Sequence, residues 1–584
     1  MFSNLNKREI VGFLLAFAIA YILLFAVAYA AFDFEDVARR VARRIVFLAL
    51  VIALGGVIYA SKISYFKSFA LLFALAASPV VISAKAYNIN INLSSLTLIV
   101  SLVALCIFFV ALLRGALKTI FSILVFVTFM IPTLVFGAYY SYSGEVLSVE
   151  AITAALESNP AEAFEYLESQ NSFWQYVIFA ALLVLGAFWV KICGVLSIKK
   201  TRSNAYLAAL FVILAASPLY TNIFKNRGMD LYSTLYNNAI THFGIYSEFV
   251  AGSPLRRQNT QILQDGEAGV YVLVIGESQD RTRMGVYGYE RDTTPFLSSN
   301  LNNPNFIFFG HAFSNHSQTT QVLSLALTAK NQYNDASFKT SPSIMEIATW
   351  AGYDVHWISN QVKFSNGAPI TQMTFPCKTR FFTQIEEHEE PYDEVLLDKI
   401  PTQGLGNKTL VVIHLFGSHF KYDKRYPSDF AKFGEGWMNE YDNSTLYNDF
   451  IMREIISRAS KIPNFKALVY FSDHGESKDT YPSGGLIGHD AGSFNLSMTR
   501  IPLYMYFSDD YIAANPSLIS NLKAHKDARF TNDLIFNLVS SIMGIHTSFD
   551  EPQNDISSEL YDASADRFKT LHGKRFIGKD SETN

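Results

Sequence analysis

Carboxylate and imidazole side chains occur at the ends of three short apolar segments in the second half of the chain. They belong to Glu277, His414, His419, Asp473 and His474. Continuous apolar runs of this length are typical of strands buried on both faces of a parallel sheet. Because ligands bind beyond the carboxyl ends of such strands, we expect these side chains to meet at one edge of the sheet.

Carboxylate oxygens and imidazole nitrogens are the ligands that proteins offer to Zn²⁺ or Mn²⁺. A cation would explain why Asp473 and His474 stand together in a tight turn, where an unpaired charge is costly. An Asp-His pair alone is more often a surface pair, but three strand ends together favour a metal site. Glu476 either orients His474 or caps a following helix, and the sequence leaves both readings open.

A polar segment, residues 313–328, turns apolar with helical spacing after Thr319 and Thr320. A hydroxyl at the start of a helix lies at the positive end of the helix dipole, beside N–H groups that bind phosphate. Coordinated to zinc, that hydroxyl would become a nucleophile. The competing reading is an ordinary threonine N-cap, which the local sequence by itself favours.

From residue 268 onwards, short apolar segments alternate with longer mixed ones. The expected strands are 270–276, 306–310, 354–359, 409–417, 467–472 and 502–508. Segments 342–351 and 444–460 have the pattern of helices. This alternation predicts an α/β sandwich with a mostly parallel sheet over residues 268–575.

The first 225 residues are different, because they hold long apolar runs. The runs are 10–32, 45–60, 67–84, 96–113, 118–138, 174–192 and 205–219. A membrane span needs about 20 apolar residues, so we expect a domain of five to seven transmembrane helices. Ala28-Tyr29-Ala30 resembles a signal-peptide cleavage site, but the preceding apolar run exceeds the usual length of about 7–15 residues, which favours an uncleaved anchor.

Lysine and arginine in short loops place the N-terminus in the cytoplasm and the later parts outside. With seven spans, the acidic loop 139–173, the linker 226–267 and the α/β domain all lie on the outer side. The segment 33–44 carries four arginines and contradicts this topology unless it forms an amphipathic helix at the membrane surface.

Composition argues against a nucleic-acid partner and against a cysteine-based site in the outer domain. The chain has 47 basic and 51 acidic residues, which argues against nucleic acid as a partner. Of its three cysteines, only Cys377 lies in the outer domain, so that domain has no internal disulfide and no cysteine-based zinc site. All twelve histidines lie at or beyond His242, which places the chemistry in the second half.

Four segments together resemble the bacterial phosphoethanolamine transferases, which are membrane-anchored members of the alkaline phosphatase and sulfatase superfamily. The segments are VIGESQDRTRMGVYGYERDTTP (274–295), NHSQTTQVLSLAL (315–327), HLFGSHFKYDKRYP (414–427) and SDHGES (472–477). The similarity covers most of residues 268–510. The acidic segment LESNPAEAFEYL (156–167) also resembles the loop between membrane helices in that family.

The resemblance implies a mechanism and a set of site residues. It implies a tightly bound zinc ion held by Glu277, Thr319, Asp473 and His474. Thr319 would attack phosphatidylethanolamine, and the phosphoethanolamine would then pass to an envelope acceptor. His419 and His489 would contact the phosphoethanolamine group or a second zinc ion. Ser158 and Glu162 would contact substrate from the membrane-side loop.

The resemblance also implies a monomer in the bacterial inner membrane, with the catalytic domain in the periplasm. Family members that act on lipid A typically carry several disulfides, whereas this outer domain cannot, which favours relatives that modify the lipopolysaccharide core or another periplasmic glycan. Five membrane helices are usual in the family, and Ala154 stands where an asparagine is often found.

Three other functions compete with this interpretation. A phosphoglycerol transferase of the same superfamily would share the threonine and the metal site, although GYERDTTP (288–295) favours the ethanolamine branch. A sulfatase-type hydrolase is disfavoured, because HSQTTQ (316–321) lacks the residues needed for formylglycine. An inactive membrane scaffold would have no reason to keep Glu277, Thr319, Asp473 and His474.

Overall fold

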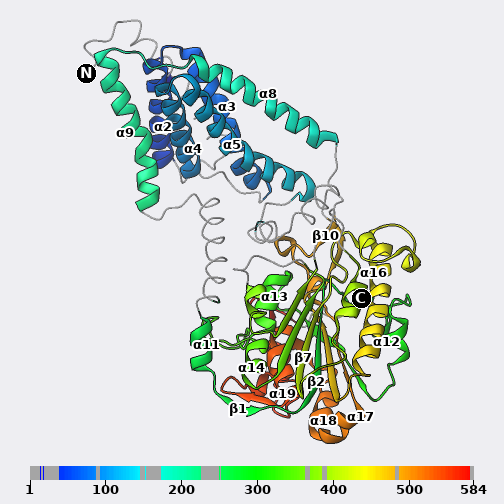
Figure 1. Cartoon of the computed structure of the whole chain (residues 1–584). Helices are drawn as coiled ribbons and strands as arrows, with labels where there is room; N and C mark the ends of the chain where they lie inside the picture. Colours follow the sequence, from blue (N-terminus) through cyan, green and yellow to red (C-terminus); the bar gives the residue numbers. More distant parts are fainter. Residues whose placement is uncertain are drawn as a thin grey trace. The chain divides into compact units, whose positions relative to one another are not determined.

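The computed structural model describes seven stretches of the chain and five single residues. The stretches are 38–86, 93–144, 173–224, 252–361, 369–383, 391–480 and 486–578, and the single residues are Leu14, Phe17, Ala18, Ile152 and Phe249. Two compact units are present, one built mainly from residues before 240 and the other mainly from residues after it. The first unit is helical and the second is α/β, as Figure 1 shows.

Long apolar helices make up the first unit. They are α2 (Ala38–Ile58), α3 (Lys62–Ala86), α4 (Leu93–Leu112), α5 (Gly115–Ser143), α8 (Phe173–Val195) and α9 (Arg202–Phe224). Among the residues that the structure describes, three helices are long and apolar enough to cross a membrane: Lys62–Ile82, Gly115–Ser141 and Tyr176–Val195. The side chains of the helices in this unit pack around a common apolar core that includes Leu48 of α2, Phe108 of α4 and Trp189 of α8.

The expected total of five to seven spans stays a prediction, because parts of the first 225 residues lie outside the described residues. The runs 67–84, 118–138 and 174–192 fall in the three helices of sufficient length. The runs 45–60, 96–113 and 205–219 form helices whose apolar stretches are shorter. The run 10–32 lies outside the described residues except for Leu14, Phe17 and Ala18. The described part of the arginine-rich segment, residues 38–44, belongs to α2, which begins at Ala38 and continues to Ile58.

A seven-stranded sheet is the centre of the second unit, with the order β3-β11-β8-β2-β7-β5-β6. The strands are β2 (Gly269–Gly276), β3 (Phe306–Phe309), β5 (Asp354–Ser359), β6 (Thr379–Phe382), β7 (Lys408–His414), β8 (Phe465–Ser472) and β11 (Leu503–Phe507). Strand β11 runs antiparallel to both of its neighbours, and the pairs among β8, β2, β7, β5 and β6 are parallel. The expected mostly parallel sheet is therefore confirmed.

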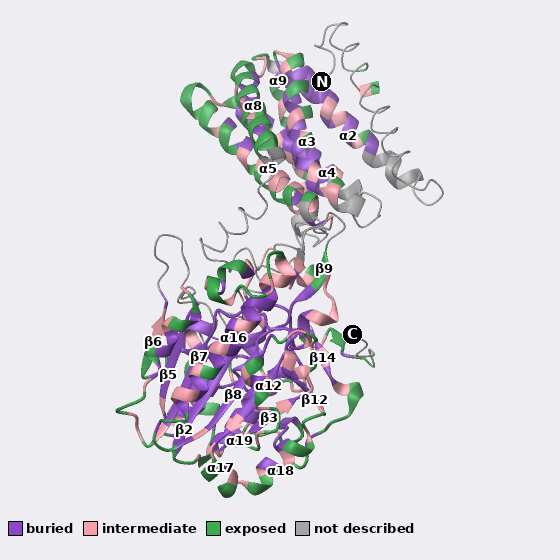
Figure 2. Ribbon diagram, turned by 90° about the vertical axis from the view of Figure 1, so that its right-hand side faces the viewer, coloured by how far each residue is buried: buried purple, intermediate pink, exposed green. Residues whose placement is uncertain are grey.

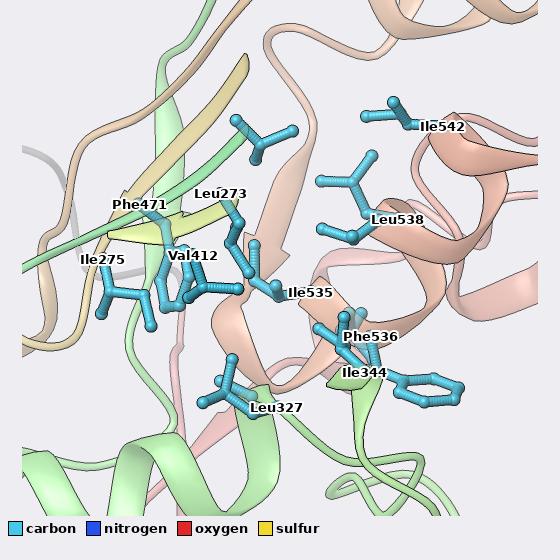
Figure 3. Packing of buried hydrophobic residues seen from close by; sticks show 14 of the residues in the cluster. Leu273, Ile275, Leu327, Ile344, Val412, Phe471, Ile535, Phe536, Leu538 and Ile542 are labelled. Atoms are coloured by element: carbon cyan, nitrogen blue, oxygen red, sulfur yellow. The ribbon is translucent and has the colours of Figure 1, made fainter. Parts of the chain in front are cut away.

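Apolar side chains cover both faces of the sheet, as the alternation along β2 shows. Leu273 and Ile275 point to a core shared with α13 (Thr319–Ala326), α14 (Ile344–Trp350) and α19 (Ile535–Met543). Figure 3 shows this core from close by. Val272 and Val274 point to the opposite core, which contains residues of α12 (Pro295–Ser299) and α16 (Trp437–Ala459). The buried strands between exposed helix surfaces are visible in Figure 2.

All six expected strands are present as β2, β3, β5, β7, β8 and β11, and the two expected helices as α14 and α16. Strand β6 is not among the expected strands, because its residues are exposed or half-buried at the edge of the sheet and carry no apolar run. Upstream of residue 268, the second unit already contains α11 (Ser253–Asn259) and β1 (Ile262–Asp265), and β1 pairs with β13 (Ile545–Thr547). Part of the expected linker 226–267 is thus folded against the α/β unit.

Candidate active site

Parallel pairing of β2 and β8 places two acidic residues side by side. Gly276 is the register partner of Ser472, so Glu277 and Asp473 are the next residues on neighbouring strands. The turn after β2 is tight: Ser278 has a left-handed backbone with φ of 56°. Its N–H donates to Oδ1 of Asp473 over 3.0 Å, which ties the two strand ends together. The conformation costs free energy in a non-glycine residue and is typical of functional sites.

Glu277, Asp473 and His474 form a cluster whose ligand atoms all lie within 4.8 Å of one another. Nε2 of His474 lies 3.3 Å from Oε1 of Glu277 and 3.4 Å from Oδ2 of Asp473. All three side chains are buried. The structure therefore brings together three residues that are up to 197 positions apart in the chain.

The cluster fits a divalent cation. Oδ2 of Asp473 and Nε2 of His474 are buried without a hydrogen-bond partner among the described residues. Nδ1 of His474 lies 2.9 Å from the carbonyl oxygen of Gly475, which can only accept, so Nδ1 carries the proton and Nε2 is left as the ligand atom. Two carboxylates and one imidazole are a donor set that zinc takes.

Without a cation, charge in this cluster is balanced by a proton. Burial alone would lower the pKa of His474, but the negative charges of Asp473 and Glu277 raise it to about 10. Burial and the charge of Glu277 raise the pKa of Asp473 to about 8. Burial opposes ionisation of Glu277, yet the nearby imidazole of His474 and its charge hold the pKa of Glu277 well below the usual range. A metal ion would replace the proton, because ligands must be deprotonated.

Thr319 joins the cluster from the helix α13. It is the first residue of this helix, preceded by Gln318 with extended backbone angles. Oγ1 of Thr319 donates to Oε2 of Glu277 over 3.1 Å. The expectation that a helix starts at Thr319 or Thr320 is confirmed, whereas the reading of Thr319 as an N-cap is wrong, because the cap position belongs to Gln318.

Gln361 is a contact of the cluster that the sequence analysis missed. Its Nε2 donates to Oε2 of Glu277 over 2.9 Å and to the carbonyl oxygen of Leu415 over 3.2 Å. The side chain is buried and lies just beyond β5. A glutamine has no charge to reveal it in the sequence; only its position two residues after a strand of the sheet could have pointed to it.

Helix α16 holds the turn that follows Glu277. This contact was not predicted from the sequence. The hydroxyl of Tyr441 accepts from the N–H of Asp280 over 2.7 Å and donates to the carbonyl oxygen of Ser278 over 2.6 Å. Gln279 donates to Thr445 on the same helix over 3.0 Å. These bonds satisfy the polar groups of an irregular buried turn and fix the direction of Glu277.

His489 and Glu476 form a second group beside His474. Nδ1 of His489 lies 3.1 Å from Oε2 of Glu476, and the ring centroids of His474 and His489 are 4.4 Å apart. Ligand atoms of His474, Glu476 and His489 lie within 4.8 Å of one another. Glu476 caps no helix, since the next element is the strand β9 (Ser477–Thr480). Among the described residues, its carboxylate hydrogen-bonds to His489 and Tyr422 and not to His474.

The two other histidines near the site lie apart from these groups. The rings of His419 and His489 are 6.4 Å apart, and His419 stacks on Phe416. Burial lowers the pKa of His419 to about 3, which leaves its imidazole neutral and able to accept a hydrogen bond. His414 is buried against Trp357, and burial lowers its pKa to about 4. Ser158 and Glu162 lie outside the described residues.

Three comparisons with known proteins give a consistent result. A family model described as Sulfatase matches residues 270–546. Phosphoethanolamine transferase EptC of Escherichia coli O18:K1:H7 (strain RS218 / NMEC) is 29% identical over 432 residues, which cover 65% of this chain and 72% of the relative. Phosphoethanolamine transferase CptA of Salmonella typhimurium (strain LT2) is 26% identical over 472 residues, which cover 73% of this chain and 80% of the relative.

A solved structure matches both units in fold. It is the integral membrane protein lipooligosaccharide phosphoethanolamine transferase A (EptA) of Neisseria meningitidis, with a TM-score of 0.56 and 18% identity over 84% of this chain and 97% of that chain. At this identity the likeness concerns the fold alone. The sequence relatives and the family model show that the chain is similar to phosphoethanolamine transferases and to the sulfatase family, and the solved structure shows that it shares their fold.

Proposed function

We propose that this protein transfers phosphoethanolamine from phosphatidylethanolamine to an acceptor of the bacterial cell envelope, with Thr319 as the nucleophile. The acceptor class is the lipopolysaccharide core, lipid A or a periplasmic glycan. The relatives with the printed name phosphoethanolamine transferase support the transferred group. The helices of sufficient length and apolar composition support a location in the inner membrane with the α/β unit in the periplasm.

The observation that carries the proposal is the hydrogen bond from Thr319 to Glu277 inside a cation-binding cluster. The hydroxyl already points its proton at Oε2 of Glu277, over 3.1 Å. The first turn of α13 adds N–H groups that stabilise the negative charge of a phosphate. Phosphoryl transfer depends mainly on such positioning and on neutralisation of charge.

In the first step, Oγ1 of Thr319 forms a bond to phosphorus, and the bond between phosphorus and the glycerol oxygen breaks. Diacylglycerol leaves as an alcohol after taking up a proton, and the phosphoethanolamine stays on Thr319. In the second step, an oxygen of the acceptor loses its proton and forms a bond to phosphorus, the bond between phosphorus and Oγ1 breaks, and Thr319 takes up a proton. Covalent capture lets a lipid donor and a second substrate use one site in turn.

Glu277, Asp473 and His474 would hold a zinc ion, with Thr319 beside it. Bound zinc would neutralise charge on the phosphate and lower the pKa of the threonine hydroxyl. The group of His489 and Glu476 lies where the ammonium and phosphate of the donor, or a second zinc ion, can bind. Tyr422 fixes Glu476 by donating to its Oε1 over 2.7 Å.

The test is to detect the covalent phosphoethanolamine on Thr319. The full-length protein in detergent is mixed with phosphatidylethanolamine and digested, and the peptide that contains Thr319 is analysed by mass spectrometry. We expect the adduct in the wild type, a reduced amount in Thr319→Ser and none in Thr319→Ala. Thr320→Ser is the matched control and should keep the adduct. An adduct in Thr319→Ala, or one formed only from phosphatidylglycerol, would contradict the proposal.

A further inference from the structure

A basic hairpin near the C-terminus lies against the segment that carries the nucleophile. Its strands are β14 (Lys569–Thr570) and β15 (Arg575–Phe576), and they pair antiparallel. Three consecutive turn residues have positive φ: Leu571 at 52°, His572 at 53° and Gly573 at 83°. Two of them are not glycine, so the turn holds a strained conformation that surrounding contacts must fix.

Those contacts go to the residues around Thr319. Oγ1 of Thr570 donates to the carbonyl oxygen of Ser314 over 2.9 Å. The N–H of His572 donates to the carbonyl oxygen of Asn315 over 3.1 Å. Nε2 of His572 lies 3.1 Å from the carbonyl oxygen of Gln321, two residues beyond Thr319 in the first turn of α13. The rings of His572 and His316 are 4.9 Å apart.

A second contact joins the hairpin to the loop that follows His489. The guanidinium of Arg575 lies 4.9 Å from the ring centroid of Phe494, which ends the turn Ala491–Ser493. The hairpin therefore contacts the segment before and at the start of α13, and also the loop after His489. Two of its cationic side chains lie over aromatic rings, Lys569 over Phe576 and Arg575 over Phe494.

Among the described residues, no acid forms an ion pair with the three cations of the hairpin. Lys574 and Arg575 are exposed and Lys569 is half-buried. Arg567 is different, because it pairs with Asp562 over 3.4 Å. The whole chain carries a net charge of −4, so three cationic side chains on a hairpin that contacts the start of α13 are a local exception. Such a cluster attracts and orients anions.

We propose that Lys569, Lys574 and Arg575 of this hairpin bind phosphate groups on the sugar acceptor and hold the acceptor beside Thr319. This inference rests on the proposed function, because it assigns the surface used in the second step. It identifies the acceptor class as a phosphorylated glycan or glycolipid. The donor does not need the hairpin, since its phosphate is bound at the metal cluster and the start of α13.

The test separates the two steps. We compare the wild type with Lys574→Glu/Arg575→Glu in detergent, using phosphatidylethanolamine as donor and purified lipopolysaccharide as acceptor. Formation of the Thr319 adduct should be unchanged. The kcat/KM for transfer to lipopolysaccharide should fall about tenfold at low salt, because the KM for lipopolysaccharide rises. The difference between the variant and the wild type should shrink to about twofold at ~0.5 M salt.

Two further comparisons distinguish binding from a merely structural role. Lys523→Glu/Lys526→Glu makes the same charge change on exposed residues outside the hairpin, in and after α18 (Pro516–Ala524), and should behave as the wild type. Lys574→Arg/Arg575→Lys should keep full transfer. With lipopolysaccharide that has been dephosphorylated by hydrofluoric acid, the rate of transfer by the wild type should fall to that of the charge-reversed variant.

The outcomes that overturn the inference differ from those that overturn the proposed function. Absence of an adduct in the wild type contradicts the function itself. Equal loss of adduct formation and transfer in the charge-reversed variant shows that the hairpin only supports the fold. A wild type that forms the adduct but does not prefer phosphorylated over dephosphorylated lipopolysaccharide contradicts the assigned acceptor class.

Discussion

The hydroxyl of Thr319 donates to Oε2 of Glu277 over 3.1 Å, although the two residues belong to different elements and are 42 positions apart. Glu277 is fixed by the end of β2, and Thr319 by the first turn of α13. The contact therefore depends on how a helix packs on a sheet and not on local sequence. It also gives the hydroxyl a defined proton acceptor beside a cation-binding cluster, which the chemistry of a nucleophile needs.

Removal of one ligand charge should abolish the response to zinc without unfolding the protein. Asp473→Asn keeps Oδ1, which accepts from the N–H groups of Ser278 and His474 over 3.0 Å and 2.7 Å. It removes a carboxylate whose pKa burial and Glu277 raise to about 8. We expect the midpoint of thermal unfolding without metal to stay equal or rise, because a buried like-charge repulsion is lost.

The measurement is thermal unfolding with and without added zinc, and with dipicolinate as chelator. Zinc should raise the midpoint of the wild type, since a ligand that binds only the folded state stabilises it. The shift should be lost in Asp473→Asn and kept in Asp423→Asn, a change of an exposed aspartate. An unchanged zinc shift in Asp473→Asn would show that the cluster is not the metal site.

Gln361 should control zinc affinity although it is uncharged. Its Nε2 holds Oε2 of Glu277 over 2.9 Å, so Gln361→Leu leaves that oxygen with Thr319 as its remaining hydrogen-bond partner among the described residues. Loss of a partner that orients a metal ligand typically costs about 10–100-fold in affinity. Competition with a chromophoric chelator measures this. Gln264→Leu, on an exposed position of β1, is the control, and equal affinities would contradict the role.

The strands of the sheet and the residues at their ends could be predicted from the sequence, because each is a local signal. β2, β7 and β8 are continuous apolar runs, and an Asp-His pair or a Glu directly after such a run is visible in the letters. The meeting of Glu277 with Asp473 then follows from the rule for parallel sheets.

The contacts that hold the site could not be predicted in the same way. Gln361 and Tyr441 are an amide and a phenol without a charge pattern, and their roles depend on where β5 and α16 pack. Glu476 was expected either to orient His474 or to cap a helix. The sequence does not show that a strand follows Glu476 or that His489 lies close enough to hydrogen-bond with it. The apolar runs 45–60, 96–113 and 205–219 lie in helices with shorter apolar stretches, because apolar composition gives the length of a run and not the bounds of a helix.

Tyr422 should act on the donor through Glu476 and His489. Its hydroxyl donates to Oε1 of Glu476 over 2.7 Å, and Oε2 of Glu476 lies 3.1 Å from Nδ1 of His489. Tyr422→Phe removes one hydrogen bond to a carboxylate, worth about 1.5–3 kcal/mol. We expect the KM for phosphatidylethanolamine in adduct formation to rise about tenfold, with a smaller change in kcat.

The matched control for this change is Tyr447→Phe. Tyr447 is a buried tyrosine of α16 whose hydroxyl has no hydrogen-bond partner among the described residues. Its removal should leave the kinetics unchanged. If Tyr422→Phe lowers thermal stability but leaves the KM for the donor unchanged, Tyr422 supports the fold and does not position His489.

Arg256 should be essential for the stability of the α/β unit, although it was expected in a linker. Its Nε lies 2.9 Å from Oε2 of Glu346, both side chains are at most 5% exposed, and its guanidinium lies 4.0 Å from the ring centroid of Phe249. Glu346 also accepts from the N–H of Ser343 as part of a capping box at α14. Breaking a buried ion pair leaves a charge without a partner and costs about 3–5 kcal/mol.

Arg257 gives a control on the neighbouring position. It is exposed and forms no ion pair with a described residue, so Arg257→Ala should change the free energy of unfolding by less than about 0.5 kcal/mol. Thermal unfolding of the full-length protein in detergent measures both variants. Adding Glu346→Gln to Arg256→Ala should recover part of the loss, because the unpaired charge is removed while a side chain able to complete the capping box remains. Equal midpoints for Arg256→Ala and Arg257→Ala would show that α11 does not belong to the stable core of the unit.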